Sequence, residues 1–197
     1  MTACRVAYIL GRYPSRSETF IRREIEAVRL SGVAVDIYAL KPGAGCEPVG
    51  EGTYRSGISP VEKLAAIIWA VGRPMRLARA ICRIAGGRLA RPVDVLKSVR
   101  NIPVSAAFAR RIKNSGAGCV HAHFAGEPAI IARTVSNLLT IPYTFSIHAR
   151  DIFVDKPPAA DTIRCARAIA ACTAAAVERA KKPVSYTHLT LPTILLV

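Results

Sequence analysis

The chain has 197 residues and a formal net charge of +15, from 28 Lys and Arg against 13 Asp and Glu. Hydrophobic residues make up 51% of it, which excludes a disordered chain and leaves room for one domain of ordinary size. No apolar run approaches the ~20 residues that a membrane span needs, and the run over residues 6–10 is too short for a secretory signal. These features predict a basic, globular, cytoplasmic protein.

The first forty residues predict a strand, a helix and a second strand. Residues 6–10 are continuously apolar, as expected for a strand buried on both faces. Ser15 and Glu18 have the spacing of a capping box, with Ser15 as the N-cap of a helix and Glu18 at its third position. Apolar side chains then recur at helical spacing at Ile21, Ile25 and Val28. Residues 33–40 are typical of a further strand, so this unit predicts a parallel sheet with a right-handed crossover.

The middle of the chain predicts a long loop followed by basic helices. Residues 41–60 contain five glycines and three prolines, which indicates the loop. Helical patterns follow over residues 62–91 and 93–113, the second interrupted near Pro103. In the first helical region an apolar face lies beside a basic cluster; the apolar face is Leu77, Ile81 and Ile84, and the cluster is Arg76, Arg79 and Arg83. We predict that this arginine cluster contacts a membrane surface.

The second half of the chain again alternates strands with helices. Strands are expected over residues 119–124, 143–148 and 168–173, with a helix over 128–139 that begins at a proline. This alternation predicts an α/β fold, a Rossmann-like doubly wound parallel sheet flanked by helices. Ligands of such sheets bind beyond the carboxyl ends of the strands, which is where His123, His148 and the loop before the first helix fall.

Three of the four histidines, His121, His123 and His148, cluster at predicted strand ends. The H-x-H spacing puts two imidazoles on one face of a strand, which suits either hydrogen bonding at the sheet edge or a metal site. A metal site needs a third and usually a fourth ligand, and His148 and Asp151 are the candidates that we identify in the sequence. A small metal hydrolase built on these residues is therefore the least favoured of the functions considered.

Three blocks of sequence carry a resemblance to a known family. They are Y-I-L-G-R-Y-P-S-R-S-E-T-F-I-R-R-E-I near the N-terminus, H-A-H-F-A-G-E-P-A from residue 121, and I-P-Y-T-F-S-I-H-A-R-D-I-F from residue 141. In this order they resemble the N-terminal domain of family 4 glycosyltransferases, from about residue 5 to about residue 177. Those enzymes have two Rossmann-like domains facing each other across a cleft, the GT-B architecture. The resemblance implies that this chain is the acceptor-side half of such an enzyme.

The resemblance also implies roles for individual residues. His148 matches the position that faces the transferred sugar, and Asp151 would orient its loop or touch the sugar, so both are candidate catalytic residues. Capping of the following turn is the alternative role of Asp151. The loop before the first helix would help to bind the acceptor. His123 and Glu127 of the second block would line the acceptor side of the cleft. The candidate acceptor-binding residues are therefore Arg12, Ser15, Ser17, Glu18, Thr19, His123 and Glu127.

The family implies a retaining, nucleotide-sugar-dependent glycosyltransferase that makes a surface polysaccharide or a glycolipid. Its partners would be a nucleotide sugar, as co-substrate, and a glycan or lipid-linked acceptor, with no metal and no other cofactor. In the family the donor binds mainly to a second domain with an E-x7-E motif, which we do not expect among these 197 residues. We therefore expect residues 1–182 to form the N-terminal domain and the uncharged residues 183–197 to be a non-native or truncated end.

A non-catalytic basic module that binds an anionic membrane surface or nucleic acid is the main alternative. A net charge of +15 attracts any polyanion. Aromatic residues make up only 6% of the chain and are not interleaved with the basic run, so no nucleic-acid partner is expected. An anionic membrane surface is the more favoured partner, which predicts a peripheral location on the inner face of the membrane.

Overall fold

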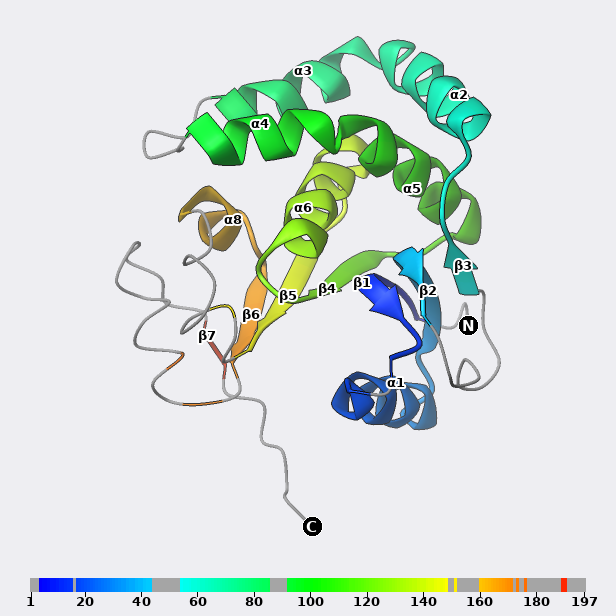
Figure 1. The fold of residues 1–197 in the computed structure, drawn as a ribbon, viewed down its shortest axis with the longest axis vertical. Helices are drawn as coiled ribbons and strands as arrows, with labels where there is room; N and C mark the ends of the chain where they lie inside the picture. Colours follow the sequence, from blue (N-terminus) through cyan, green and yellow to red (C-terminus); the bar gives the residue numbers. More distant parts are fainter. Residues whose placement is uncertain are drawn as a thin grey trace.

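In the computed structural model, a parallel β-sheet is covered by helices on both faces (Figure 1). The structure describes residues 4–15, 17–43, 54–85, 92–148, 151, 160–171, 173, 176 and 189–190. Within these residues the strands lie in the order β3-β2-β1-β4-β5-β6-β7, and every neighbouring pair is parallel. The strand order reverses between β1 and β4, which is the switch point of a doubly wound sheet. The predicted fold class is confirmed.

The strands agree with the sequence-based prediction except at the two edges of the sheet. They are β1 (Arg5–Tyr13), β2 (Ala34–Pro42), β3 (Tyr54–Ser56), β4 (Cys119–His123), β5 (Tyr143–Ile147), β6 (Ala168–Ala171) and β7 (Leu189–Thr190). Strand β3 lies in the predicted loop, because three residues are too few to show an alternating pattern. Strand β7 lies in the segment that we expected to be an uncharged tail, and it pairs with β6. The remainder of that segment is outside the described residues.

The two long helical patterns each divide into two helices. The helices are α1 (Thr19–Leu30), α2 (Pro60–Val71), α3 (Pro74–Ala85), α4 (Pro92–Arg100), α5 (Ile102–Ser115), α6 (Glu127–Leu139) and α8 (Ala160–Arg164). The pattern over residues 62–91 is interrupted before Pro74, and the pattern over 93–113 before Pro103. A proline has no backbone N–H to donate and its ring clashes with the preceding turn, so each of these prolines lies in the first turn of a new helix instead.

Helix α1 begins later than the sequence predicted. Glu18 occupies the N-cap position and its side chain makes no capping hydrogen bond, while the hydroxyl of Ser15 lies 3.1 Å from that of Ser17. The predicted capping box, with Ser15 as N-cap and Glu18 at the third position, is therefore wrong. Strand β1 continues to Tyr13, and the chain needs the following residues to turn back over the sheet before a helix can start.

The two faces of the sheet are covered unequally (Figure 1). Helices α5 and α6 pack on one face, with α2, α3 and α4 packed in turn against them. Helix α1 lies on the opposite face, where Ile21 and Ile25 are buried as predicted. Side chains of a strand alternate between faces, so Ala7 and Ile9 of β1 enter the larger core while Tyr8 faces α1.

Candidate functional site

Three histidines meet near the carboxyl edge of the sheet, beside the switch point between β1 and β4. His121 and His123 lie on β4, on the face that α1 covers, and their ring centroids are 5.0 Å apart. His148 follows β5, and its Nε2 lies 3.2 Å from Nδ1 of His123. The rings of His123 and His148 are stacked, with centroids 5.5 Å apart. The structure thus brings together the histidines that the sequence placed on adjacent strand ends.

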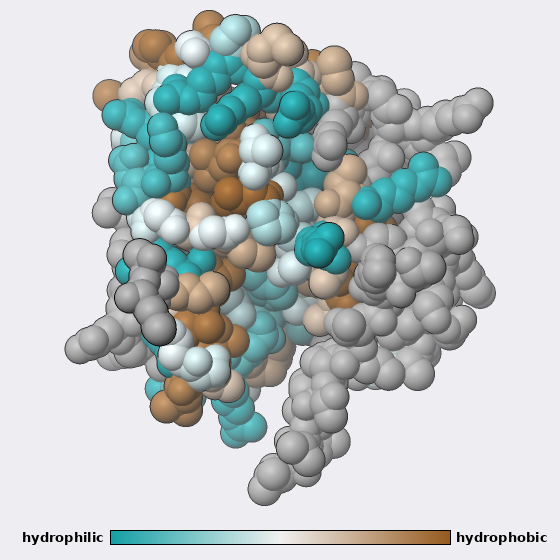
Figure 2. Space-filling model, turned by 180° about the vertical axis from the view of Figure 1, so that it is seen from behind, coloured by the Kyte–Doolittle hydropathy of each residue, from teal (hydrophilic) through white to brown (hydrophobic). Residues whose placement is uncertain are grey.

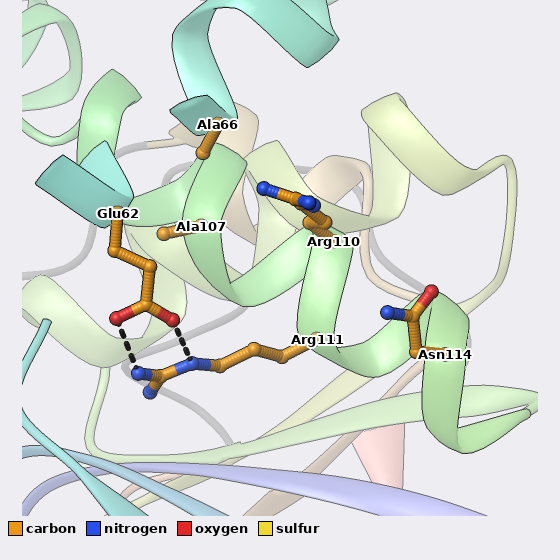
Figure 3. Close-up of a pocket in the computed structure, with 6 residues that line it drawn as sticks. All are labelled: Glu62, Ala66, Ala107, Arg110, Arg111 and Asn114. Carbon is orange, nitrogen blue, oxygen red and sulfur yellow. Dashed lines mark hydrogen bonds and ion pairs between the residues drawn. The ribbon is translucent and has the colours of Figure 1, made fainter. Parts of the chain in front are cut away.

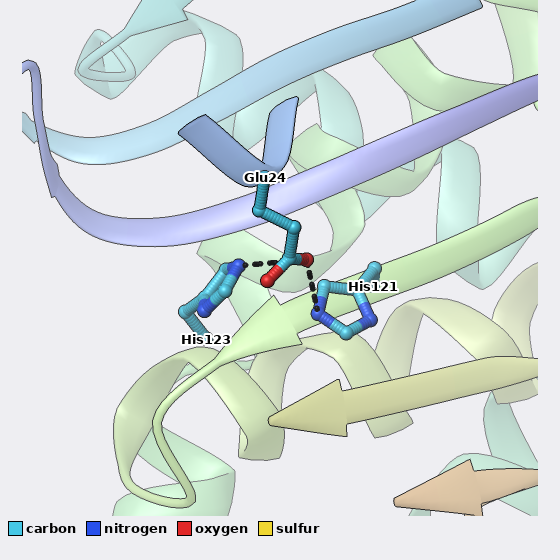
Figure 4. Close-up of side chains that lie close together, drawn as sticks. All are labelled: Glu24, His121 and His123. Atoms are coloured by element: carbon cyan, nitrogen blue, oxygen red, sulfur yellow. Dashed lines mark ion pairs between the residues drawn. The ribbon is translucent and has the colours of Figure 1, made fainter. Parts of the chain in front are cut away.

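Helix α1 adds a carboxylate to this cluster, and Figure 4 shows it between the two imidazoles of β4. Oε1 of Glu24 lies 3.3 Å from Nε2 of His123 and 3.7 Å from Nε2 of His121. The Tyr8 hydroxyl donates a hydrogen bond of 3.0 Å to the same oxygen. Sequence reasoning missed Glu24. A signal for it existed, because position 24 lies within the apolar stripe of α1, where a charged residue indicates a polar partner beneath.

Strand β5 holds His121 from the other side. Nδ1 of His121 lies 2.7 Å from the Thr144 hydroxyl, and its Nε2 lies 3.2 Å from the Ser146 hydroxyl. Both hydroxyls come from the strand that pairs with β4, in register with the two histidines. His121 therefore makes polar contacts through both ring nitrogens, inside the layer between the sheet and α1.

Burial determines the charge of the cluster. Burial, aided by the charge of His123, lowers the pKa of His121 to about 3 and that of His148 to about 4, although Glu24 opposes both shifts. Burial by itself would raise the pKa of Glu24. The polar contact with His123, the charges of both β4 histidines and the Tyr8 hydroxyl outweigh burial and lower that pKa to about 2. At neutral pH, His121 and His148 are neutral and Glu24 is ionised.

Two phenylalanines contact the His148 ring. The ring centroids of Phe20 and Phe124 each lie 4.7 Å from that of His148. Phe20 is 41% exposed and directly follows Thr19. Phe124 has φ 71°, in the left-handed region that bulky side chains avoid, at a cost of about 1–3 kcal/mol. Backbone strain of this kind concentrates at functional sites, which supports placing the site around His148.

Asp151 joins the two loops that carry the site. Its Oδ2 accepts the backbone N–H of His148 at 2.9 Å, and its Oδ1 accepts the backbone N–H of Ala125 at 3.1 Å. The side chain is buried. The carboxylate therefore fixes the residue after β5 relative to the loop after β4, an arrangement that fits the orienting role considered for Asp151.

The remaining candidate residues lie around this edge with different exposures. Arg12 near the end of β1, Ser17 in the connecting segment and Thr19 at the start of α1 are exposed, and Ser15 and Glu18, also between the two elements, are half-buried. Glu127 begins α6, and its carboxylate pairs with Arg100 of α4 at 3.1 Å. Phe20 of α1 contacts the His148 ring, and sequence reasoning did not select it.

A pocket of about 270 Å³ lies elsewhere, between α2 and α5 (Figure 3). Arg111 donates to both carboxylate oxygens of Glu62 at 2.7 Å and to the carbonyl of Gly57 at 3.1 Å. The Glu62 carboxylate at this pocket is therefore neutralised by Arg111, and the lining of the pocket shares no residue with the histidine cluster. We place the candidate functional site at the cluster.

No protein-family profile matches the sequence, and no curated protein matches it. Two solved structures of sucrose-phosphate synthase from Thermosynechococcus elongatus are similar to this chain. The first has a TM-score of 0.54 at 14% identity, over 95% of this chain and 87% of that one. The second has a TM-score of 0.51 at 12% identity, over 95% of this chain and 47% of that one, so this chain spans about half its length. The fold is therefore the Rossmann-like α/β fold found in a GT-B glycosyltransferase.

Proposed function

We propose that this chain is the acceptor-binding part of a retaining, nucleotide-sugar-dependent glycosyltransferase of family 4 type, which makes a surface polysaccharide or a glycolipid. The observation that carries the proposal is the His123–His148 pair, at the edge of a GT-B-like sheet where doubly wound folds bind ligands. The three sequence blocks that resemble the family coincide with the segments that build this edge.

The chemistry of the site suits a sugar. His148 is half-buried and neutral at pH 7, so its imidazole can exchange hydrogen bonds with sugar hydroxyls without introducing a charge. Phe20 offers an exposed apolar face next to it, and an aromatic wall with a few convergent polar groups is the usual composition of a small-molecule site. The segment from Arg12 to Thr19 would contact the acceptor, and Asp151 would hold the His148 loop in place.

The nucleotide sugar would bind mainly to a second domain across the cleft. The 197-residue chain by itself is therefore expected to bind an acceptor and not to transfer sugar, because the groups that position the donor against the acceptor would be absent. Sugar transfer by this chain alone would contradict that division of roles.

The test is acceptor binding by the chain, followed through the histidine ring signals in NMR spectra. Glycans and lipid-linked oligosaccharides are titrated first, and a DNA oligonucleotide is titrated as the control. We expect an acceptor to shift the signals of the stacked His123 and His148 rings, told apart with the His148→Gln variant, at concentrations where the oligonucleotide does not. Binding of the oligonucleotide with no response to any glycan would instead support the basic-module alternative.

We also propose that the basic helices hold the protein at the inner face of the membrane. Within the part of the chain that the structure describes, no helix is long and apolar enough to cross a bilayer. Leu64, Ile68 and Val71 of α2 are exposed, and Arg76 and Arg79 of α3 are exposed nearby. Figure 2 shows hydrophobic and hydrophilic side chains next to one another at the top of the molecule. Exposed apolar residues beside arginines are typical of interfacial binding.

The predicted apolar face of α3 itself is divided between core and solvent. Leu77 packs against the larger core, whereas Ile81 is 45% exposed. The side chains of Arg83 and Ile84 lie outside the described residues. The apolar residues available to a membrane therefore come mainly from α2, which the sequence analysis did not select.

A further inference from the structure

Three potential ligand atoms converge between α1 and β4. They belong to Glu24, His121 and His123 and lie within 4.8 Å of one another. We propose that these residues form a binding site for a first-row divalent transition metal ion, with Zn²⁺ as the ion expected to bind. Two imidazoles and one carboxylate are a donor set that Zn²⁺ and Fe²⁺ sites use. In the sequence, His148 and Asp151 were the candidates for further ligands, whereas the fold supplies Glu24.

The outer contacts of both histidines are those of metal ligands. A histidine that binds a metal through one ring nitrogen usually donates the other N–H to a fixed acceptor. Nδ1 of His121 lies 2.7 Å from the Thr144 hydroxyl, and Nδ1 of His123 lies 3.2 Å from Nε2 of His148. When both Nδ1 atoms donate, the Nε2 lone pair of His123 faces the Glu24 carboxylate, and Nε2 of His121 would exchange its 3.2 Å contact with the Ser146 hydroxyl for the ion.

The Nε2 atom of His123 supplies an independent observation. The side chain is fully buried, and among the described residues none gives this nitrogen a hydrogen bond of acceptable geometry. Its nearest polar neighbour is Oε1 of Glu24 at 3.3 Å. A buried nitrogen with no hydrogen bond costs free energy, and a cation between it and the carboxylate would remove that cost.

The distances between the three ligand atoms suit a small metal ion if the atoms move slightly closer together. Ligand atoms at ~2.0–2.1 Å from a tetrahedral zinc lie about 3.4 Å from one another. The two contacts of the Glu24 oxygen, 3.3 and 3.7 Å, are close to that spacing. The remaining separation, between the two histidine nitrogens, is 4.8 Å at most and would have to shrink by up to about 1.4 Å, which rotation of the imidazole side chains would have to supply.

The site has an entrance and leaves coordination positions open. The Glu24 side chain is 39% exposed, whereas His123 is fully buried, so an ion would enter from the carboxylate side. Three protein ligands leave at least one position for water. The ion would join α1 to β4 and hold His123 against His148. The proposal rests on these contacts alone and not on the glycosyltransferase function.

The experiment measures Zn²⁺ binding by the untagged 197-residue chain after treatment with a chelator. Isothermal titration and elemental analysis give the affinity and stoichiometry, and Co²⁺ substitution reports the ligand geometry through its visible absorption. We expect one tightly bound ion per chain and a rise in Tm on adding Zn²⁺, because an ion that binds only the folded state stabilises it. Less than one bound ion per chain, or an unchanged Tm, would overturn the proposal.

Matched variants locate the ion. Glu24→Gln is expected to raise the Kd by tenfold or more, and Thr144→Val, which removes the hydroxyl that Nδ1 of His121 contacts, by about 10–100-fold. Glu26→Gln lies on the same helix, in an exposed pair with Arg22, and should bind Zn²⁺ like the parent chain. Glu24 is partly exposed, so its substitution tests the site even if changes at the buried histidines prevent folding. Equal affinities of the Glu24 and Glu26 variants would place any bound ion elsewhere and refute the site.

Discussion

Nδ1 of His123 lies 3.2 Å from Nε2 of His148, so the end of β4 and the residue after β5 are joined across the carboxyl edge of the sheet. A neutral imidazole has one N–H, and the donor in this pair therefore decides the state of the other nitrogen of His123. If His123 donates, its Nε2 presents a lone pair to Glu24 and can bind a cation. If His148 donates, Nε2 of His123 carries the proton and lies 3.3 Å from Oε1 of Glu24, where no cation can then bind it. Binding of a cation between Glu24 and His123 therefore requires that His123 donates, and His148 accepts, the hydrogen bond between the two rings.

The His148→Ala substitution tests the catalytic role, in a transferase that contains this chain together with its donor-binding domain. We expect kcat to fall by about 10²–10³, because a hydrogen bond to developing charge is commonly worth ~2.7–4 kcal/mol. The KM for the acceptor should change little, since the lost interaction acts mainly in the transition state. Steady-state kinetics check this, and His148→Gln, which retains a donor, should recover part of the rate. A loss of less than about tenfold in the Ala variant would assign His148 to packing.

Asp151→Asn is expected to destabilise the protein by about 1–3 kcal/mol. The buried carboxylate accepts two backbone N–H groups, and an amide would present a donor to one of them. Urea unfolding followed by circular dichroism measures the change. Glu26→Gln, an exposed carboxylate change of the same kind, serves as the control and should stay within about 0.5 kcal/mol. Equal stabilities of the two variants would show that Asp151 does not hold the loops together.

Stability is expected to fall on mild acidification. The pKa values of His121 and His148 in the folded chain, about 3 and about 4, lie below the ordinary 6.5, so the unfolded chain binds more protons in between. The free energy of unfolding should therefore be highest above about pH 6.5 and decrease as the pH falls toward 4. Glu24, whose pKa is lowered from 4.5 to about 2, adds a further loss below pH 4.5.

Urea titrations at several pH values, with a chelator present, measure this dependence. His148→Gln removes one of the groups that must become charged, so it should flatten the slope. A free energy of unfolding that stays constant from neutral pH to about 4 would contradict the burial of these imidazoles.

Binding to membranes is expected to depend on charge. A protein with Arg76, Arg79 and Arg83 all changed to Glu should lose co-sedimentation with anionic vesicles, because each arginine near such a surface contributes about 1 kcal/mol. High salt should release the parent protein, since screening acts over about 10 Å at 0.1 M. Vesicles of neutral lipid provide the control. Equal binding by both proteins, or binding insensitive to salt, would contradict the proposal.

The Glu62–Arg111 pair at the pocket of Figure 3 is expected to be structural. Glu62→Gln should lower the free energy of unfolding by about 1 kcal/mol, because it weakens a bidentate, partly buried ion pair. The exposed Arg22–Glu26 pair should be worth about 0.3–0.5 kcal/mol, so Glu26→Gln is again the comparison. Unfolding free energies check both, and acceptor binding by the Glu62 variant should equal that of the parent. If the Glu62 variant lost acceptor binding, this pocket and not the histidine cluster would be the acceptor site.

The local pattern of the sequence was sufficient for the central strands and for the approximate places of α1, α6 and the two long helical regions. Period-2 and continuous apolar runs identify β1, β2, β4, β5 and β6, and Pro103 marks the division between α4 and α5, whereas the division before Pro74 was not predicted. The same reasoning placed His123 and His148 at neighbouring strand ends, because carboxyl ends of parallel strands share one edge. Each of these inferences needs information from only a few consecutive residues.

Contacts between distant segments were decided by the tertiary structure alone. Glu24 meets His121 and His123 only because the crossover lays α1 on the face to which β4 directs those side chains, and Asp151 reaches Ala125 across two loops. The start of α1 depends in the same way on how far β1 extends before the chain turns. Periodicity shows which side of an element is buried. It does not show which residue of another element lies opposite, because that depends on strand register and helix placement, which the whole core determines together.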